Sequence, residues 1–271
     1  MIKQAIIPLA GLGTRMLPLT SVMPKELMPI NGKPNLQYIL DECIEAGVKE
    51  FIFIISKKKL SIKKYFFNDN FYKKILKKKK DKRLLQEYKK IKKYQKMIKF
   101  VYQNKPKGTG DAVLKCKRLI KSKYFLMLLP DDLIIKNNCS KEMIRLHKKT
   151  NASIIATKRV ERNTVSRWGI LSIINKKKRH FQIKDVVEKP SIKKAPSNFA
   201  IIGRYILPAK IFGEIKKLKP GQGGEIHITD AIRGLIKKEN KFFGNIFMGK
   251  YLDCGTLSGY INSGIQISKG K

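Results

Sequence analysis

The architecture follows from one stretch near the start of the chain, Ala5-Ile6-Ile7-Pro8-Leu9-Ala10-Gly11-Leu12-Gly13-Thr14-Arg15. Its first half is apolar and predicts a buried strand, and its glycines open a loop whose backbone N–H groups can point at an anion. Met16 occupies the third glycine position of a dinucleotide-binding fingerprint, and no Gly-Lys-Ser/Thr sequence closes a Walker loop. The loop therefore predicts a phosphate site outside those two classes, with a plain tight turn as the alternative.

Downstream of this loop, strand-like and helix-like segments alternate. Apolar residues recur at helical spacing from Leu36 to Ala46, and Gly47 follows as a terminator, so a helix is predicted there. Further strands are predicted at residues 51–55, 100–102, 125–129 and 152–157, further helices at 111–119 and 143–149, and an antiparallel pair at 170–174 and 183–187 around the turn Lys176-Lys177-Lys178. This alternation predicts an α/β fold with a mostly parallel central sheet and flanking helices, which binds ligands at the carboxyl ends of its strands.

The length of 271 residues allows one large domain or two small ones. We expect a single domain over residues 1–271, because no low-complexity linker interrupts the alternation. Between Lys57 and Lys99, 19 Lys and Arg stand against 3 Asp and Glu, a net charge of +16, while apolar residues still recur at helical intervals. This segment predicts a basic insertion made of a pair of surface helices.

The formal net charge of +40 raises the alternative of a nucleic-acid binder. The lysines are not gathered in one arm, however, and they accompany many Ile, Asn, Phe and Tyr residues, whose codons are rich in A and T. We interpret the charge as compositional drift that placed lysine at solvated positions. We therefore expect no specific nucleic-acid partner.

Several features favour a cytoplasmic protein with no membrane partner. No signal peptide is visible, and the longest apolar runs, at residues 51–55 and 124–130, are far shorter than the roughly 20 residues of a membrane-spanning helix. Cys43, Cys116, Cys139 and Cys254 lie far apart without a Cys-x-x-Cys pair. Such spacing favours reduced thiols over disulfides or a zinc site.

Charged residues cluster at the ends of predicted strands. Lys25, in Pro24-Lys25-Glu26, follows Arg15 by ten residues, and two such cations suit phosphate oxygens. Pro130-Asp131-Asp132 comes just past the strand at 125–129, and Leu252-Asp253-Cys254-Gly255 offers a second carboxylate beside a glycine. Distant carboxylates of this kind suit Mg²⁺, which commonly takes one or two of them plus substrate phosphates. A capped turn at the end of a strand is the alternative.

The run from Pro8 to Pro18, continued by Pro24-Lys25-Glu26-Leu27-Met28-Pro29, resembles the bacterial UTP–glucose-1-phosphate uridylyltransferase family. The resemblance runs in order from Ile2 to about Tyr260. It implies a Rossmann-like nucleotidyltransferase fold, similar to that of the glycosyltransferase-A class. It also implies that UTP and glucose 1-phosphate are the substrates, that UDP-glucose and pyrophosphate are the products, and that Mg²⁺ is the cofactor.

The same resemblance assigns nucleotide contacts. The arginine and lysine that assist the triphosphate correspond to Arg15 and Lys25. Tyr102-Gln103-Asn104 with Lys107-Gly108-Thr109-Gly110 resembles the segment whose glutamine reads uracil, and a glutamine supplies both a donor and an acceptor for that edge. The expected nucleotide-binding residues are Ala10, Gly11, Gly13, Thr14, Glu26, Gln103, Gly108 and Asp132, the last of which is also close to the metal shell.

Sugar and metal contacts are implied in the same way. Val187-Glu188-Lys189-Pro190 resembles the signature whose glutamate accepts sugar hydroxyls and whose lysine holds the sugar phosphate. Taken without the other matching motifs, this sequence is typical of an exposed turn. Trp168-Gly169-Ile170 and Ile202-Gly203-Arg204-Tyr205 match further sugar-side positions. The resemblance thus assigns the sugar to Gly169, Glu188 and Gly203, the metal to Asp131 and Asp253, and catalysis to Arg15, Lys25 and Lys189.

The implied mechanism is an in-line attack by a phosphate oxygen of glucose 1-phosphate on the α-phosphorus of UTP. Because that phosphate is already anionic, no strong general base is required, and catalysis depends on positioning and charge stabilisation. His147, His180 and His227 share no spacing with one another or with an acid, so we interpret them as core or surface residues.

The sequence departs from the family pattern at several positions. Gly224 replaces a carboxylate, His227 a glutamine, Asp111 a histidine, and Thr256-Leu257-Ser258 an Asn-Lys-Leu sequence. The sequence stops at Lys271, short of most of the family's helical tail, so assembly into a homo-oligomer is left open. Two alternatives remain: a related enzyme that uses dTTP or another sugar phosphate, and a catalytically weak relative that regulates a partner.

Overall fold

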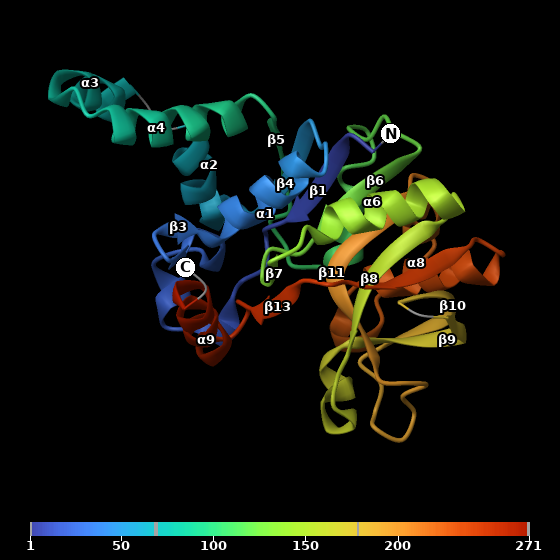
Figure 1. Ribbon diagram of the computed structural model, residues 1–271. Helices are drawn as coiled ribbons and strands as arrows, with labels where there is room; N and C mark the ends of the chain where they lie inside the picture. Colours follow the sequence, from blue (N-terminus) through green and yellow to red (C-terminus); the bar gives the residue numbers. More distant parts are fainter. Residues whose placement is uncertain (1, 68–69, 178, 270–271) are drawn as a thin grey trace.

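The computed structural model describes residues 2–67, 70–177 and 179–269. In this part of the chain, one nine-stranded sheet has the order β5-β4-β1-β6-β11-β8-β12-β10-β9 (Figure 1). Its strands are β1 (Gln4–Pro8), β4 (Glu50–Ile55), β5 (Ile98–Tyr102), β6 (Tyr124–Leu128), β8 (Ser153–Arg159), β9 (Gly169–Lys177), β10 (His180–Glu188), β11 (Phe199–Pro208) and β12 (Phe242–Ile246). Two short ladders pair β2 (Pro29–Ile30) with β3 (Lys33–Pro34) and β7 (Asp132–Ile135) with β13 (Lys250–Asp253).

The first half of the sheet is parallel. β1 pairs in parallel with β4 and β6, and β4 pairs in parallel with β5. These strands are rich in Ile, Leu and Phe because both of their faces are covered, and Ile6 and Ile7 in β1 are fully buried. The carboxyl ends of the four strands therefore meet at one edge of the sheet, which we call the cleft edge.

The second half of the sheet is mixed. β11 runs antiparallel to β6 and β8, and β9 and β10 are antiparallel, whereas β12 is parallel to β8. Phe199, the first residue of β11, pairs with Arg159, the last residue of β8. The chain thus enters β11 at the end of the sheet where β8 finishes, and β11 therefore runs antiparallel to β8. The predicted α/β fold with a central sheet and flanking helices is confirmed. The sheet is mixed where the sequence predicts a mostly parallel one, because β9, β10 and β11 run antiparallel to their neighbours, and the parallel half is the one that contains the glycine loop.

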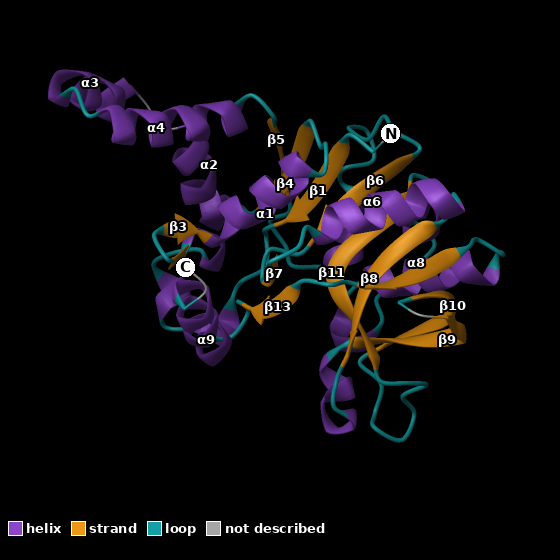
Figure 2. Ribbon diagram, in the orientation of Figure 1, coloured by secondary structure: helices purple, strands orange, loops and turns teal. Residues whose placement is uncertain are grey.

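Helices cover both faces of the sheet (Figure 2). Because neighbouring side chains of a strand point to opposite faces, Ile6 and Ile7 belong to different cores. Ile7 packs in one core with Leu36 and Met143, which come from α1 and α6, and Ile6 packs in the other with Ile232 of α8. The helices are α1 (Asn35–Glu45), α2 (Leu60–Phe67), α3 (Asn70–Lys79), α4 (Lys82–Gln95), α5 (Thr109–Leu114), α6 (Cys139–Thr150), α7 (Ile211–Ile215), α8 (Ile228–Lys237) and α9 (Leu257–Ser268).

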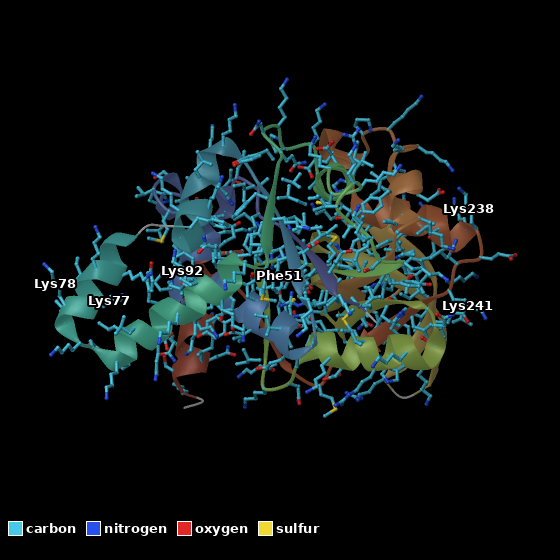
Figure 3. All side chains as sticks on the ribbon, turned by 90° about the horizontal axis from the view of Figure 1, so that it is seen from above. Phe51, Lys77, Lys78, Lys92, Lys238 and Lys241 are labelled. Atoms are coloured by element: carbon cyan, nitrogen blue, oxygen red, sulfur yellow. The ribbon has the colours of Figure 1, made fainter. Side chains whose placement is uncertain are left out.

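The basic insertion forms an arm of three helices, α2, α3 and α4, where the sequence predicts a pair. α2 buries Ile62 and Phe66 in the core, while α3 and α4 project away from the body (Figure 1). Figure 3 shows Lys77 and Lys78 on this arm and Lys238 and Lys241 at the opposite end of the molecule. Basic residues are therefore spread over the surface as well as concentrated on the arm.

Most other predicted elements lie within a few residues of their expected bounds. The helix predicted at residues 111–119 is shorter, because α5 ends at Leu114. The turn predicted at Lys176-Lys177-Lys178 falls partly outside the described residues, since Lys178 is not among them and Lys177 ends β9. All four cysteines are buried and free. Among the helices of the described ranges, none combines the length and apolar character that crossing a membrane requires.

Candidate active site

Two adjoining cavities open at the cleft edge. The smaller cavity has a volume of about 230 Å³ and lies at the ends of β1, β5 and β6. The larger cavity has a volume of about 300 Å³ and is bounded by β6, β10, β11 and β13. Leu129, Asp131, Thr109 and Glu225 line both cavities. The segment that follows β6 is thus the place where the occupants of the two cavities would meet.

The smaller cavity gathers most of the residues predicted to bind a nucleotide. Gly108 has a positive φ of 93°, and a Cβ atom there would lie 2.6 Å from the carbonyl oxygen of Ile226, so the position requires glycine. Three residues predicted to bind the nucleotide do not line this cavity. Gly13 and Thr14 line neither cavity, and Asp132 lines the larger one. The predicted site residues that line the smaller cavity are Ala10, Gly11, Lys25, Glu26, Gln103, Gly108 and Asp131.

Lys25, Asp131 and Arg15 form a charged group between the two cavities. The Nζ of Lys25 lies 2.7 Å from Oδ2 of Asp131, and Nη2 of Arg15 lies 3.6 Å from the same oxygen. Burial opposes the charge of both Lys25 and Asp131, but their mutual attraction prevails, raising the pKa of Lys25 above its ordinary value and lowering that of Asp131. Both side chains therefore stay charged at neutral pH.

Lys59 is a site residue that the sequence interpretation missed. Its Nζ donates to both carboxylate oxygens of Glu26, at 2.8 and 2.9 Å, and Lys59 and Glu26 are only 7% and 1% exposed. Burial lowers the pKa of Lys59, against the attraction of Glu26. The only signal in the sequence was its place in a run of three lysines, which looks like solvated surface. Lys59 is the residue that links the base of the arm to the smaller cavity.

Asp132 is held by the protein on both sides. The Tyr251 hydroxyl donates to its Oδ1 at 2.7 Å, and the Gly203 backbone N–H donates to its Oδ2 at 2.9 Å. Burial and the neighbouring charge of Asp131 raise the pKa of Asp132 to about 6. A Cβ atom on Gly203 would lie 2.5 Å from both Oδ2 of Asp132 and Cβ of Leu129. Gly203, predicted as a sugar contact, thus also shapes the acidic turn.

Arg204 stabilises the segment that leads into Asp131 and Asp132. Its role was not predicted from the sequence. Arg204 is fully buried, and its Nη2 lies 2.9 Å from Oε2 of Glu42 in α1. Its Nη1 donates to the carbonyl of Leu129 at 3.1 Å. This buried ion pair ties Leu129, the residue before Pro130-Asp131-Asp132, to helix α1.

Asp253 lies opposite Asp132 in the β7–β13 ladder and lines the larger cavity with Asp131. Its Oδ1 accepts from the Gly255 N–H at 2.8 Å and its Oδ2 from the Thr256 hydroxyl at 3.0 Å, which leaves lone pairs on both oxygens. Among the described residues, no group of three His, Cys, Asp or Glu side chains forms a closed metal site. Two carboxylates that line one cavity fit Mg²⁺, which completes its shell with water and substrate phosphate.

The predicted sugar-side residues all line the larger cavity. Glu188, at the end of β10, pairs in register with Gly169, and its Oε2 accepts from the Thr229 hydroxyl at 2.8 Å. Lys189 has a positive φ of 42°, and its backbone N–H donates to the Trp168 carbonyl at 3.0 Å. A lysine in this unfavourable region marks a position that its surroundings impose.

Comparison with known proteins agrees with this geometry. The nucleotidyl transferase family model matches residues 4–269. UTP–glucose-1-phosphate uridylyltransferase of Bacillus subtilis is 37% identical over 268 residues, which cover 98% of this chain and 91% of the relative. A crystal structure of a UDP-glucose pyrophosphorylase complexed with UDP-glucose superposes with a TM-score of 0.88 at 36% identity, covering 100% of both chains. A UTP-bound UGPase from Acinetobacter baumannii gives a TM-score of 0.88 at 32% identity, covering 98% of this chain and 93% of that one.

The chain belongs to the UTP–glucose-1-phosphate uridylyltransferase family. Two of its departures from the family pattern, Gly224 and His227, lie on either side of Ile226. Ile226 holds the loop of residues 107–110 in place, because its N–H donates to the Lys107 carbonyl at 2.9 Å and its carbonyl accepts from the Gly110 N–H at 2.7 Å. Gly224, where the family pattern has a carboxylate, has a positive φ of 72°. His227 is 7% exposed and lines the larger cavity, a place that the sequence did not indicate.

Proposed function

We propose that this chain transfers the uridylyl group of UTP to glucose 1-phosphate, giving UDP-glucose and pyrophosphate. The observation that supports this most directly is the meeting of two cavities at Lys25, Asp131 and Arg15, with the nucleotide-side residues of the family on one side and its sugar-side residues on the other. The relative from Bacillus subtilis bears the name of this reaction, and the solved neighbours contain UTP and UDP-glucose.

In this proposal the smaller cavity receives the uridine and the larger cavity receives the glucose. A phosphate oxygen of glucose 1-phosphate forms the new bond to the α-phosphorus of UTP, and the bond from that phosphorus to the bridging oxygen breaks as pyrophosphate leaves. Glu188 accepts sugar hydroxyls, and Lys189 holds the sugar phosphate in line. Arg15 and Lys25 stabilise the negative charge that builds up on the phosphates.

We also propose Mg²⁺ as the cofactor, held by Asp131 and Asp253. When bound, the ion supplies positive charge to the triphosphate. The observation that supports the proposal is that both residues line the larger cavity, where their carboxylate oxygens can serve as metal ligands. Lys25 keeps Asp131 ionised, as a metal-binding carboxylate has to be.

The test is pyrophosphate release by the purified protein. UTP and dTTP are each offered with glucose 1-phosphate and with other sugar 1-phosphates, with Mg²⁺ or with excess chelator. We expect the highest kcat/KM for UTP with glucose 1-phosphate, and loss of activity in the chelator that returns when Mg²⁺ is restored. A preference for dTTP or another sugar would replace the proposed substrates, and no release with any pair would favour the regulatory alternative.

Two further expectations belong to this proposal. A cytoplasmic location suits a protein whose four thiols are all free and buried. Assembly into a homo-oligomer stays a prediction, and light scattering on the purified protein measures it.

A further inference from the structure

The side chain of Gln103 is fixed by two acceptors in the smaller cavity. Its Nε2 donates to Oδ2 of Asp111 at 2.7 Å and to the carbonyl of Gly108 at 3.2 Å. A carboxylate and a carbonyl can only accept hydrogen bonds, so the amide nitrogen, and not the amide oxygen, has to face them. The two acceptors therefore determine which way round the amide group of Gln103 lies.

This arrangement uses both N–H groups of Gln103 inside the protein. Gln103 is 6% exposed and lines the smaller cavity. Within the described residues, no donor is directed at its Oε1. The part of Gln103 that is left for an occupant of the cavity is thus an oxygen with unused lone pairs. A free glutamine offers both a donor and an acceptor, whereas this one offers an acceptor only.

We propose that Asp111 is a positioning residue that holds Gln103 with its Oε1 toward the nucleobase, so that the site selects a pyrimidine with an N–H at ring position 3. Uracil has that N–H, whereas cytosine has an unprotonated nitrogen there that faces an acceptor with repulsion. The inference rests on the proposed function and deepens it, since it assigns the choice of UTP over CTP to a pair of residues, one of which departs from the family pattern.

Asp111 is itself held in place. Its side chain is 17% exposed, and the Nζ of Lys115, one helical turn later in the chain, lies 3.8 Å from its Oδ2. The preceding residue, Gly110, is fixed through its N–H bond to Ile226, and a Cβ atom on Gly110 would lie 2.8 Å from that carbonyl oxygen. The backbone next to Asp111 is therefore held in place by Ile226.

The test compares Asp111→Ala with Asp111→Asn in kinetics with UTP and CTP. Asp111→Asn removes the charge but keeps an acceptor oxygen, so the difference between the two variants isolates the hydrogen bond to Gln103. For Asp111→Ala we expect the KM for UTP to rise about tenfold, equal to ~1.4 kcal/mol, and the preference for UTP over CTP to fall by a similar factor. For Asp111→Asn we expect both values to stay within about threefold of the wild type, and in both variants the KM for glucose 1-phosphate should change less than twofold.

A double-mutant cycle with Gln103→Ala decides whether Asp111 acts through Gln103. In the Gln103→Ala background, Asp111→Ala should change the UTP-to-CTP preference by less than about twofold, because the group that it positions is gone. The proposal is overturned if the effect persists at full size in that background, or if UTP and CTP lose affinity equally. Should Asp111→Ala fail to fold by circular dichroism, Asp111→Ser, which is too short to reach Nε2, takes its place in the cycle.

Calorimetric binding of UTP and CTP to the same variants separates this inference from the proposed function. A wild-type protein that binds UTP in preference to CTP without releasing pyrophosphate would contradict the proposed reaction while supporting the positioning role. A wild-type protein that turns over UTP and CTP equally well would support nucleotidyl transfer and contradict the role of Asp111.

Discussion

Lysines occupy two regions of this molecule under opposite physical conditions. At the cleft edge, Lys59 is buried and Lys25 is half-buried, and they pair with the carboxylates of Glu26 and Asp131, respectively. On the arm, the exposed lysines at positions 73, 74, 77, 78, 79, 80 and 82 have no acidic partner among the residues that the structure describes; we call them the arm lysines. Exposed charges are screened within about 8 Å at physiological salt, whereas buried or partly buried pairs are screened much less. Burial and a paired carboxylate, more than the number of charges, therefore determine whether a lysine of this chain contributes to the site.

The largest expected effect comes from removing the charged group of the cleft. Lys25→Ala and Asp131→Ala should each lower kcat by at least about 100-fold, a loss typical of deleting a preorganised electrostatic group. Lys77→Ala, on the arm, is the matched control and should leave kcat within about twofold. The measurement is steady-state pyrophosphate release, with circular dichroism to verify folding. An unchanged kcat in either cleft variant would contradict a catalytic role for that residue.

The second effect concerns stability. Lys59→Met leaves the carboxylate of Glu26 buried without its partner, which should lower the free energy of unfolding by about 3 kcal/mol. Lys58→Met is the matched control, because Lys58 is exposed, and it should stay within about 0.5 kcal/mol of the wild type. Urea denaturation measures both. Equal losses of unfolding free energy in the two variants would show that burial does not distinguish Lys59 from its exposed neighbour Lys58.

A third variant tests geometry at constant charge. Gly203→Ala would place a Cβ atom 2.5 Å from Oδ2 of Asp132, so we expect about a tenfold loss of kcat/KM together with about 2 kcal/mol of destabilisation. Gly264→Ala, in α9, is the control, since no atom lies within 4 Å of the added methyl group, and it should be neutral or slightly stabilising. Full activity in Gly203→Ala would mean that the acidic turn tolerates displacement.

These variants also mark how far the sequence could predict the structure. The strand-loop pattern around Gly11 is local, and the rule that ligands bind at the carboxyl ends of parallel strands predicted that Lys25 and Asp131 lie at one edge. Gln103, which lines the same cavity, was predicted only from the family resemblance. β11 was not predicted, because Gly203 and Arg204 interrupt its apolar run, whereas the apolar run of the equally buried β6 is continuous.

Partner choice over long separations escaped prediction for another reason. Arg204 and Glu42 are 162 residues apart, and Lys59 and Glu26 are 33 apart. Hydrophobic periodicity reports which face of an element is buried, but it carries no information about which two charges will meet in the interior. The pairs that hold the site in place were therefore visible only in the folded chain.

The smallest expected effect is on the arm. Replacing Lys73, Lys74, Lys77 and Lys78 together by Gln should change kcat/KM for UTP by less than about twofold at 150 mM salt, because solvated and screened charges contribute little to a site that they do not contact. The same variant should bind duplex DNA more weakly than the wild type at 50 mM salt. For both proteins, DNA binding should fall by orders of magnitude between 50 and 200 mM salt, as counterion release predicts. Fluorescence anisotropy measures the DNA binding across that range. Tight binding at 200 mM salt that depends on these four lysines would contradict compositional drift and give the arm a partner of its own.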